Sequence, residues 1–125
     1  MKQAERDSRT ITRMLEDIET LQERVAHFNL TAQSFAADRS FEGEIAFDAT
    51  MNPLYRIVED AGHLSDEVTA SLPEIPWHNI RGFRNIVAHG YWEIDRDAAW
   101  LIINDDIPAL AEALKRYRDN QSGQQ

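Results

Sequence analysis

The chain has 125 residues, a formal net charge of −9 and no cysteine. This length suits a single domain with a core of its own, and a hydrophobic fraction of 42% is typical of a globular chain rather than a disordered one. The lack of cysteine excludes disulfides, thiolate metal sites and a cysteine nucleophile. The acidic charge argues against a protein that follows long stretches of nucleic acid, because such binding depends on basic residues. An acidic net charge is still compatible with a small local basic site.

No segment has the pattern of a signal peptide or a membrane span. The first ten residues are polar and lack an apolar core. The longest apolar run, 98–103, is far shorter than the roughly 20 residues needed to cross a bilayer. We therefore expect a cytoplasmic protein with no membrane contact.

Apolar residues recur at steps of three and four in the first half of the chain, which predicts amphipathic helices. A first helix is expected from about Ser8, as its N-cap, to His27. Residues 29–44 indicate a break. A second long helix is predicted over 45–71, and Pro53 inside it is expected to cause a kink or a fresh start.

The second half predicts shorter helices. One is expected over 77–88, with Gly90 as a left-handed stop after it. Another is predicted to start near Asp95 or Asp97 and to break at Pro108. A last helix is expected after Asp106 as its cap.

No stretch shows sustained alternation of apolar and polar residues, so the predicted fold is all-α. We expect an up-and-down bundle of four to five helices with short loops. It forms a single domain over residues 1–118, followed by a disordered polar tail over 119–125.

The segment 76–92, PWHNIRGFRNIVAHGYW, contains no carboxylate although the chain has 22 acidic residues. It contains two arginines and two histidines: His78, Arg81, Arg84 and His89. This local departure from the acidic background marks the place where an anion such as a phosphate could bind.

A helical wheel separates this segment into faces. Its core face is formed by Trp77, Ile80, Phe83 and Val87. His78, Asn85 and His89 share a second face, and Arg84 lies against the edge of the core face. A guanidinium held against apolar surface is partly desolvated, which strengthens its hold on a phosphate.

Arg84 and His89 are five residues apart, so they point about 140° apart on a straight helix. Two routes would bring them together. The helix could end early at Gly90 and turn His89 round, or a twofold dimer could bring both residues of both chains into one shared cleft.

The run Arg84-Asn85-Ile86-Val87-Ala88-His89-Gly90-Tyr91 resembles the R-x-x-x-x-H-x-Y pattern of HepT-like proteins, which belong to the HEPN superfamily of helical ribonucleases. The resemblance covers roughly residues 7–115. One departure is visible in the second long helix, where the family usually has an Ile-Gly-Glu-Ala-like stretch. The corresponding Val58-Glu59-Asp60-Ala61 keeps the acid as Asp60 and replaces the glycine with Glu59.

The resemblance implies the toxin of a toxin–antitoxin pair, acting as a metal-independent endoribonuclease on RNA. His89 would be the general base or acid, Arg84 would clamp the phosphate, and Asn85 would orient His89 or the phosphate. Arg81 and His78 would bind RNA phosphates. The alternative from the residues alone is structural, with Arg84 at a core edge and His89 at a helix end.

The resemblance also implies a cognate minimal nucleotidyltransferase as antitoxin, with Tyr91 as the acceptor of its AMP groups. The alternative for Tyr91 is simple packing. A second hypothesis for the whole chain is a binding module that pairs with this partner without significant nuclease activity. We expect no cofactor and no metal, because the histidines, His63 among them, are taken to stand alone.

Overall fold

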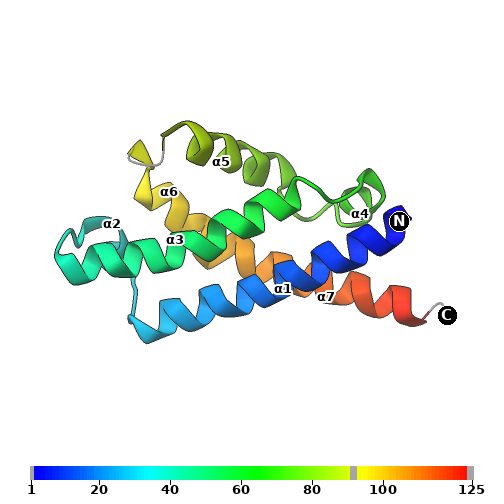
Figure 1. The fold of residues 1–125 in the computed structure, drawn as a ribbon, viewed down its shortest axis with the longest axis horizontal. Coiled ribbons are helices and arrows are strands. Elements are labelled where there is room, and N and C mark those ends of the chain that lie inside the picture. Colours follow the sequence, from blue (N-terminus) through cyan, green and yellow to red (C-terminus); the bar gives the residue numbers. More distant parts are fainter. Residues whose placement is uncertain (1, 91–92, 124–125) are drawn as a thin grey trace.

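The computed structural model describes residues 2–90 and 93–123, without the side chains of residues 86, 88 and 89. It confirms the all-α fold, since every long element in the described ranges is a helix (Figure 1). In chain order the helices are α1 (Gln3–His27), α2 (Ala32–Ala37), α3 (Phe41–Ala61), α4 (Asp66–Ser71), α5 (Trp77–Gly90), α6 (Arg96–Leu101) and α7 (Ile107–Gly123), with a π-helical turn at Ile102–Asp106 between the last two.

Helix α3 lies at the centre of the bundle. It packs against α1 on one side and α5 on the other, while α7 packs against α1. In Figure 1, α1 and α3 run in opposite directions, and the start of α1 lies on the same side of the molecule as the end of α7. The short α2 and α6 pack together at the opposite end.

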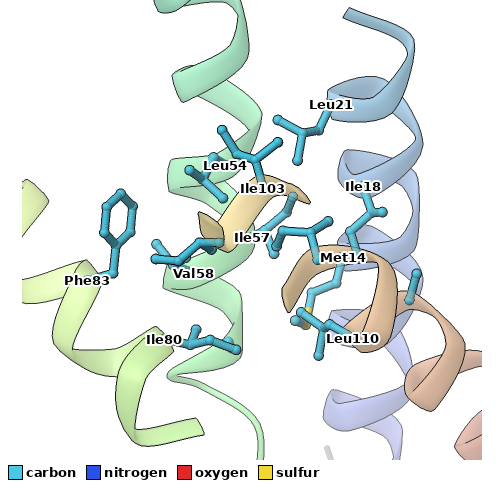
Figure 2. Packing of buried hydrophobic residues seen from close by; sticks show 14 of the residues in the cluster. Met14, Ile18, Leu21, Leu54, Ile57, Val58, Ile80, Phe83, Ile103 and Leu110 are labelled. Atoms are coloured by element: carbon cyan, nitrogen blue, oxygen red, sulfur yellow. The ribbon is translucent and has the colours of Figure 1, made fainter. Parts of the chain in front are cut away.

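The core lies between α1, α3, α5 and α7 (Figure 2). Its fully buried side chains include Met14, Ile18, Leu21, Leu54, Ile57, Val58, Ile80, Ile107, Leu110 and Leu114. Each large apolar side chain buried in this way contributes roughly 1.5–3 kcal/mol relative to an exposed one. The spacing of these residues by three and four confirms the predicted apolar faces.

The predicted second long helix is in fact two helices. Helix α3 runs through Pro53 without a fresh start and ends at Ala61, and α4 begins after Ser65. Ser65 caps α4, and its Oγ and backbone N–H both donate to the buried carboxylate of Asp7, at 2.6 and 3.1 Å. Because Asp7 lies on α1, this contact fixes the break between α3 and α4 from a distant part of the chain. Helix α1 itself begins at Gln3, earlier than the predicted Ser8.

The end of the chain differs from the prediction at Pro108. Asp95 caps α6 as expected, accepting from the backbone N–H groups of Asp97 and Ala98. Pro108 does not separate two helices, because the wider π-helical turn leads directly into α7 and accommodates the proline. Asp106 is the last residue of that turn. Helix α7 continues to Gly123, so the predicted domain boundary at 118 falls inside it.

Helix α5 also ends later than predicted. It includes both His89 and Gly90, and none of the glycines in the described ranges has a positive φ. The expected left-handed stop at Gly90 is therefore wrong, and His89 lies within the helix.

Candidate active site

Helix α5 presents a polar face outward because its apolar face is held in the core. Trp77, Ile80, Phe83 and Val87 are buried, which confirms the predicted core face. The indole of Trp77 also donates to the carbonyl oxygen of Leu72 at 3.0 Å, which fixes the start of the helix. As a result, the helix cannot turn about its axis without exposing this face.

Three of the predicted site residues lie on the outward face of α5. His78, Arg81 and Asn85 are exposed and follow one another at helical spacing. Gly82 lies among them, and a Cβ placed there would meet no other atom within 4 Å. This face is open to an incoming ligand.

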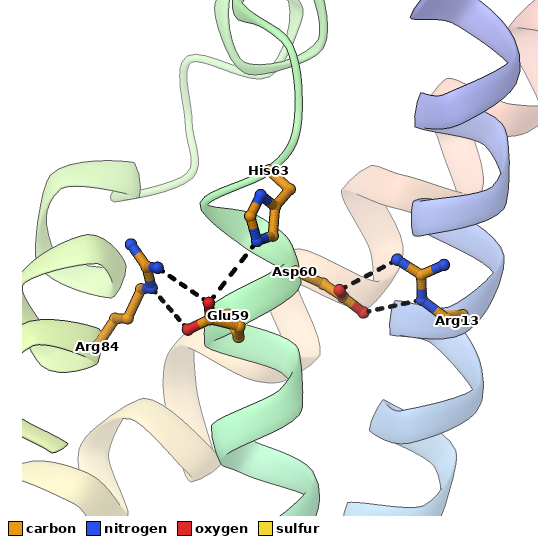
Figure 3. Close-up of polar contacts among 5 residues, drawn as sticks. All are labelled: Arg13, Glu59, Asp60, His63 and Arg84. Atoms are coloured by element: carbon orange, nitrogen blue, oxygen red, sulfur yellow. Dashed lines mark hydrogen bonds and ion pairs between the residues drawn. The ribbon is translucent and has the colours of Figure 1, made fainter. Parts of the chain in front are cut away.

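Arg84 lies at the side of α5, where the helix meets α3. Its side chain is 40% exposed and its guanidinium makes two hydrogen bonds to the Glu59 carboxylate. Nε donates to Oε2 at 2.7 Å and Nη2 donates to Oε1 at 2.9 Å (Figure 3). The stem of Arg84 passes Gly62, where a Cβ would lie 3.8 Å from Cδ. The predicted position of Arg84 at the edge of the core face is confirmed.

The pair keeps both partners charged at neutral pH. The hydrogen bond from Arg84 is the main cause that lowers the pKa of Glu59, and burial acts in the opposite direction. The hydrogen bond to Glu59 is likewise the main cause that raises the pKa of Arg84. The guanidinium therefore stays cationic and its orientation is set by Glu59.

His63 joins this pair one helical turn after Glu59. Its Nε2 lies 3.6 Å from Glu59 Oε1 (Figure 3). The interpretation of His63 as a lone histidine is therefore wrong, because it forms an i, i+4 pair with a carboxylate. Two such residues do not make a metal site, and the described part of the chain contains no group of three or more potential metal ligands among His, Cys, Asp and Glu.

The carboxylate that faces the motif belongs to Glu59 and not to Asp60. Asp60 points to α1, where it accepts from Arg13 Nη2 at 3.2 Å and Nε at 3.4 Å. Sequence reasoning gave Glu59 no role. A signal was available, because Glu59 follows the fully buried Val58 at the edge of the apolar face of α3, as Arg84 follows the buried Phe83 on α5.

Two predicted residues lie outside what the structure describes. The backbone of His89 is helical, but its side chain is not described, and Tyr91 lies outside the described residues. The helical backbone nevertheless decides one question. Because α5 continues through Gly90, His89 keeps its helical register, about 140° from Arg84. An early helix end therefore does not bring the two residues together.

Among the described residues, no helix combines the length and the apolar character that a membrane span needs.

Comparison with known proteins gives consistent results. The family model "Ribonuclease HepT-like" matches residues 9–117. A protein of Methanocaldococcus jannaschii named "Putative RNase" is 28% identical over 67 residues, which cover 54% of this chain and 62% of that protein. A "Probable ribonuclease HepT" of Thermococcus cleftensis is 26% identical over 90 residues, which cover 69% of this chain and 82% of that protein. No solved structure gives a significant match.

Proposed function

The chain belongs to the HepT-like ribonuclease family, and from this we propose that it is an endoribonuclease that cleaves RNA by attack of the ribose 2′-OH on the adjacent phosphate. The observation that carries the proposal is the state of Arg84. Its guanidinium is charged and fixed by two hydrogen bonds to Glu59, and the Arg84 side chain is 40% exposed beside a face of α5 that carries no carboxylate. Such a group is suited to hold a phosphate as negative charge develops on it.

The proposed reaction needs only a base, an acid and a cation. A histidine with a pKa near neutral removes the proton of the 2′-OH, and His89 is the residue of the motif that has this chemistry. The 2′ oxygen forms a bond to phosphorus, and the bond from phosphorus to the 5′ oxygen breaks. That oxygen takes up a proton, which leaves a 2′,3′-cyclic phosphate and a free 5′-OH. No metal takes part in this scheme.

The remaining residues of the outward face would bind the RNA strand. Arg81 and His78 are exposed on the same face as Asn85 and can contact phosphates on either side of the cleaved bond. Asn85 is the proposed orienting residue for His89 or for the phosphate. This arrangement places positive charge locally in a chain whose net charge is −9.

Cleavage by Arg84→Ala and His89→Ala variants tests the catalytic assignment. Each substitution should lower RNA cleavage by a factor of roughly 100 or more, since each removes a group that acts in the transition state. Arg84→Ala should melt close to wild type, because the Arg84 side chain is partly exposed. The melting temperature of His89→Ala is measured alongside as a control for folding. Full activity of either variant would remove that residue from the proposed mechanism.

We further propose that the active site is shared by two chains related by a twofold axis. The divergence of about 140° between Arg84 and His89 motivates this, since the helix does not end before His89. The outer face of α3 supports it. Phe41, Ile45 and Tyr55 are 76%, 45% and 40% exposed, and they lie within about 40° of Glu59 around the helix axis. These exposed apolar side chains share the face with the exposed Asp48 and Asn52, on the side of α3 that carries Glu59. A mixed face of this kind suits an isologous interface with a second copy.

Mixing two inactive variants tests the shared site directly. In a mixed dimer of Arg84→Ala with His89→Ala, one intact arginine and one intact histidine come from different chains. An equimolar mixture that exchanges subunits should then regain about one quarter of wild-type cleavage. If each chain carries a complete site, the mixture should stay inactive.

The proposed biological role is the toxin of a toxin–antitoxin pair, controlled by a cognate minimal nucleotidyltransferase. Tyr91 follows His89 by two residues and is the proposed acceptor of AMP. The added phosphate would compete with RNA for Arg84 and Arg81. Co-expression with the partner should add about 329 Da per AMP group, and Tyr91→Phe should abolish this addition. Equal protection of cells from wild type and Tyr91→Phe would show that the partner inhibits by binding alone.

The net charge of −9 favours one alternative, a binding module that pairs with the nucleotidyltransferase and has no significant nuclease activity. The same experiments separate the two functions. A wild-type protein that accepts AMP and does not cleave RNA at any tested concentration would support the binding module.

A further inference from the structure

We propose that Glu59 is a positioning residue for Arg84, so that α3 as well as α5 supplies a functional residue to the site. The inference rests on the proposed ribonuclease function and extends it to a carboxylate outside the motif. It concerns the orientation of the guanidinium rather than its presence.

Glu59 holds Arg84 in a bidentate grip, in which one carboxylate accepts two hydrogen bonds from one guanidinium. A guanidinium has five N–H donors in one plane, and a carboxylate that accepts from two of them fixes both the plane and its rotation. Glu59 accepts from Nε and Nη2 at 2.7 and 2.9 Å. The grip engages two of the five donors, so the other three remain chemically able to bind phosphate oxygens. A phosphate can therefore bind Arg84 while Glu59 holds it.

The backbones at Glu59 and Arg84 are fixed by buried neighbouring residues. Glu59 follows Val58 and precedes Ala61 on α3, and both of these side chains are fully buried. Arg84 follows Phe83, which is 5% exposed on α5. Since α3 and α5 pack against each other, the distance between the two backbones is set by the core. The fixed backbones keep the two side chains within hydrogen-bonding reach of each other, although both are partly exposed.

The negative charge of Glu59 gives it a second candidate role, neutralisation of the Arg84 charge. The experiment has to distinguish this role from positioning. A carboxylate beside the guanidinium cancels its charge at long range, so removal of Glu59 would strengthen binding of any polyanion. If neutralisation were the main role, loss of Glu59 would improve cleavage. If positioning is the main role, loss of Glu59 lowers the rate of the chemical step, because a misplaced guanidinium stabilises the transition state less well.

Three substitutions compared with wild type provide the test. Glu59→Ala removes the grip, and Glu59→Gln keeps the size and one acceptor oxygen. Asp60→Asn is the matched control, because this neighbouring acid on the same helix pairs with Arg13 and not with Arg84. The readouts are kcat and KM for a short RNA with a fluorescent label, together with the melting temperature of each variant.

We expect kcat to fall by about 10–100-fold in Glu59→Ala, with KM changed by less than about threefold. Glu59→Gln should be intermediate, and Asp60→Asn should match wild type in kcat. The melting temperatures of the Glu59 variants should stay within a few degrees of wild type. A merely structural role would lower the melting temperature without this selective loss of kcat.

Two results would overturn the proposal, and they differ from a failure of the proposed function. If wild type cleaves RNA and Glu59→Ala cleaves equally well or faster, Glu59 is not a positioning residue and the ribonuclease assignment stands. If Asp60→Asn loses as much kcat as Glu59→Gln, the positioning role is likewise wrong and the ribonuclease assignment still stands. If wild type itself cleaves no RNA, the proposed function fails and the positioning role fails with it.

Discussion

Gly62 offers a graded test of where Arg84 lies, because it stands directly beside the guanidinium. Its backbone is right-handed, with φ −68° and ψ −15°, so a side chain causes no backbone strain there. A Cβ at this position would lie 3.4 Å from the Glu59 carbonyl oxygen and 3.7 Å from Arg84 Nη1. These are ordinary contact distances, and alanine therefore fits.

Gly62→Ala should stabilise the protein, because alanine has fewer conformations than glycine in the unfolded chain. The expected gain is about 0.4–1 kcal/mol, which corresponds to a melting temperature higher by roughly 1–5 °C for a domain of this size. Cleavage should be unchanged. The two measurements are a thermal unfolding curve followed by circular dichroism and an RNA cleavage assay on the same samples.

Gly62→Val is the contrasting variant. A Cβ at position 62 would already be in van der Waals contact with Arg84 Nη1. The two methyl groups of valine extend further, so we expect them to displace the guanidinium. We expect a loss of about tenfold in kcat with the fold retained. Full cleavage by Gly62→Val, or a fall of more than a few degrees in the melting temperature of Gly62→Ala, would refute the placement of Arg84 against Gly62.

Further predictions concern the core, a buried carboxylate and the pH dependence. Leu54→Ala, at a fully buried position, should lower the free energy of unfolding by about 2–5 kcal/mol in urea titrations. Asp7→Ala should cost about 1–3 kcal/mol in the same assay, because the N–H and Oγ of Ser65 lose their acceptor. Burial is the main cause that raises the pKa of Asp106, so its ionised form is disfavoured in the folded state and its penalty grows as the pH rises. Asp106→Asn should therefore melt at a higher temperature than wild type at pH 7, and at a similar temperature near pH 3. The pKa of Glu59 is lowered, so its grip is present above the ordinary titration range of glutamate and is lost only as the pH falls below it. The pH–rate profiles of wild type and Glu59→Gln should thus have the same shape between about pH 5 and 9.

The periodicity of apolar residues was sufficient to predict the fold class and most of the core. The faces of α1, α5 and the second half of α3 were identified correctly because buried residues on a helix must recur every three or four positions. In the first half of α3 the prediction was wrong, since Ile45 was expected on the apolar face and is 45% exposed. A helix over 77–88 was predicted for the same reason, and the structure extends it to Gly90. The edge position of Arg84 followed from its angle relative to Phe83.

Contacts between distant parts of the chain were beyond this kind of reasoning. The break between α3 and α4 depends on the contact of Ser65 with Asp7, which is 58 residues away in the sequence. The role of Glu59 depends on a contact with Arg84 across 25 residues. The π-helical turn that accommodates Pro108 has no periodic signal of its own. The chemistry assigned to His89 and Tyr91 stays a prediction.

The central claim is that Arg84 and His89 cleave RNA through its own 2′-OH, and a single substrate substitution tests it most directly. A short RNA with one deoxyribose at the cleaved position is compared with the all-ribose strand, in the presence of a metal chelator. The account predicts that the all-ribose strand gives a 2′,3′-cyclic phosphate and a 5′-OH, and that cleavage at the substituted position disappears. Continued cleavage beside the deoxyribose, or complete loss of cleavage of the all-ribose strand in chelator, would contradict it.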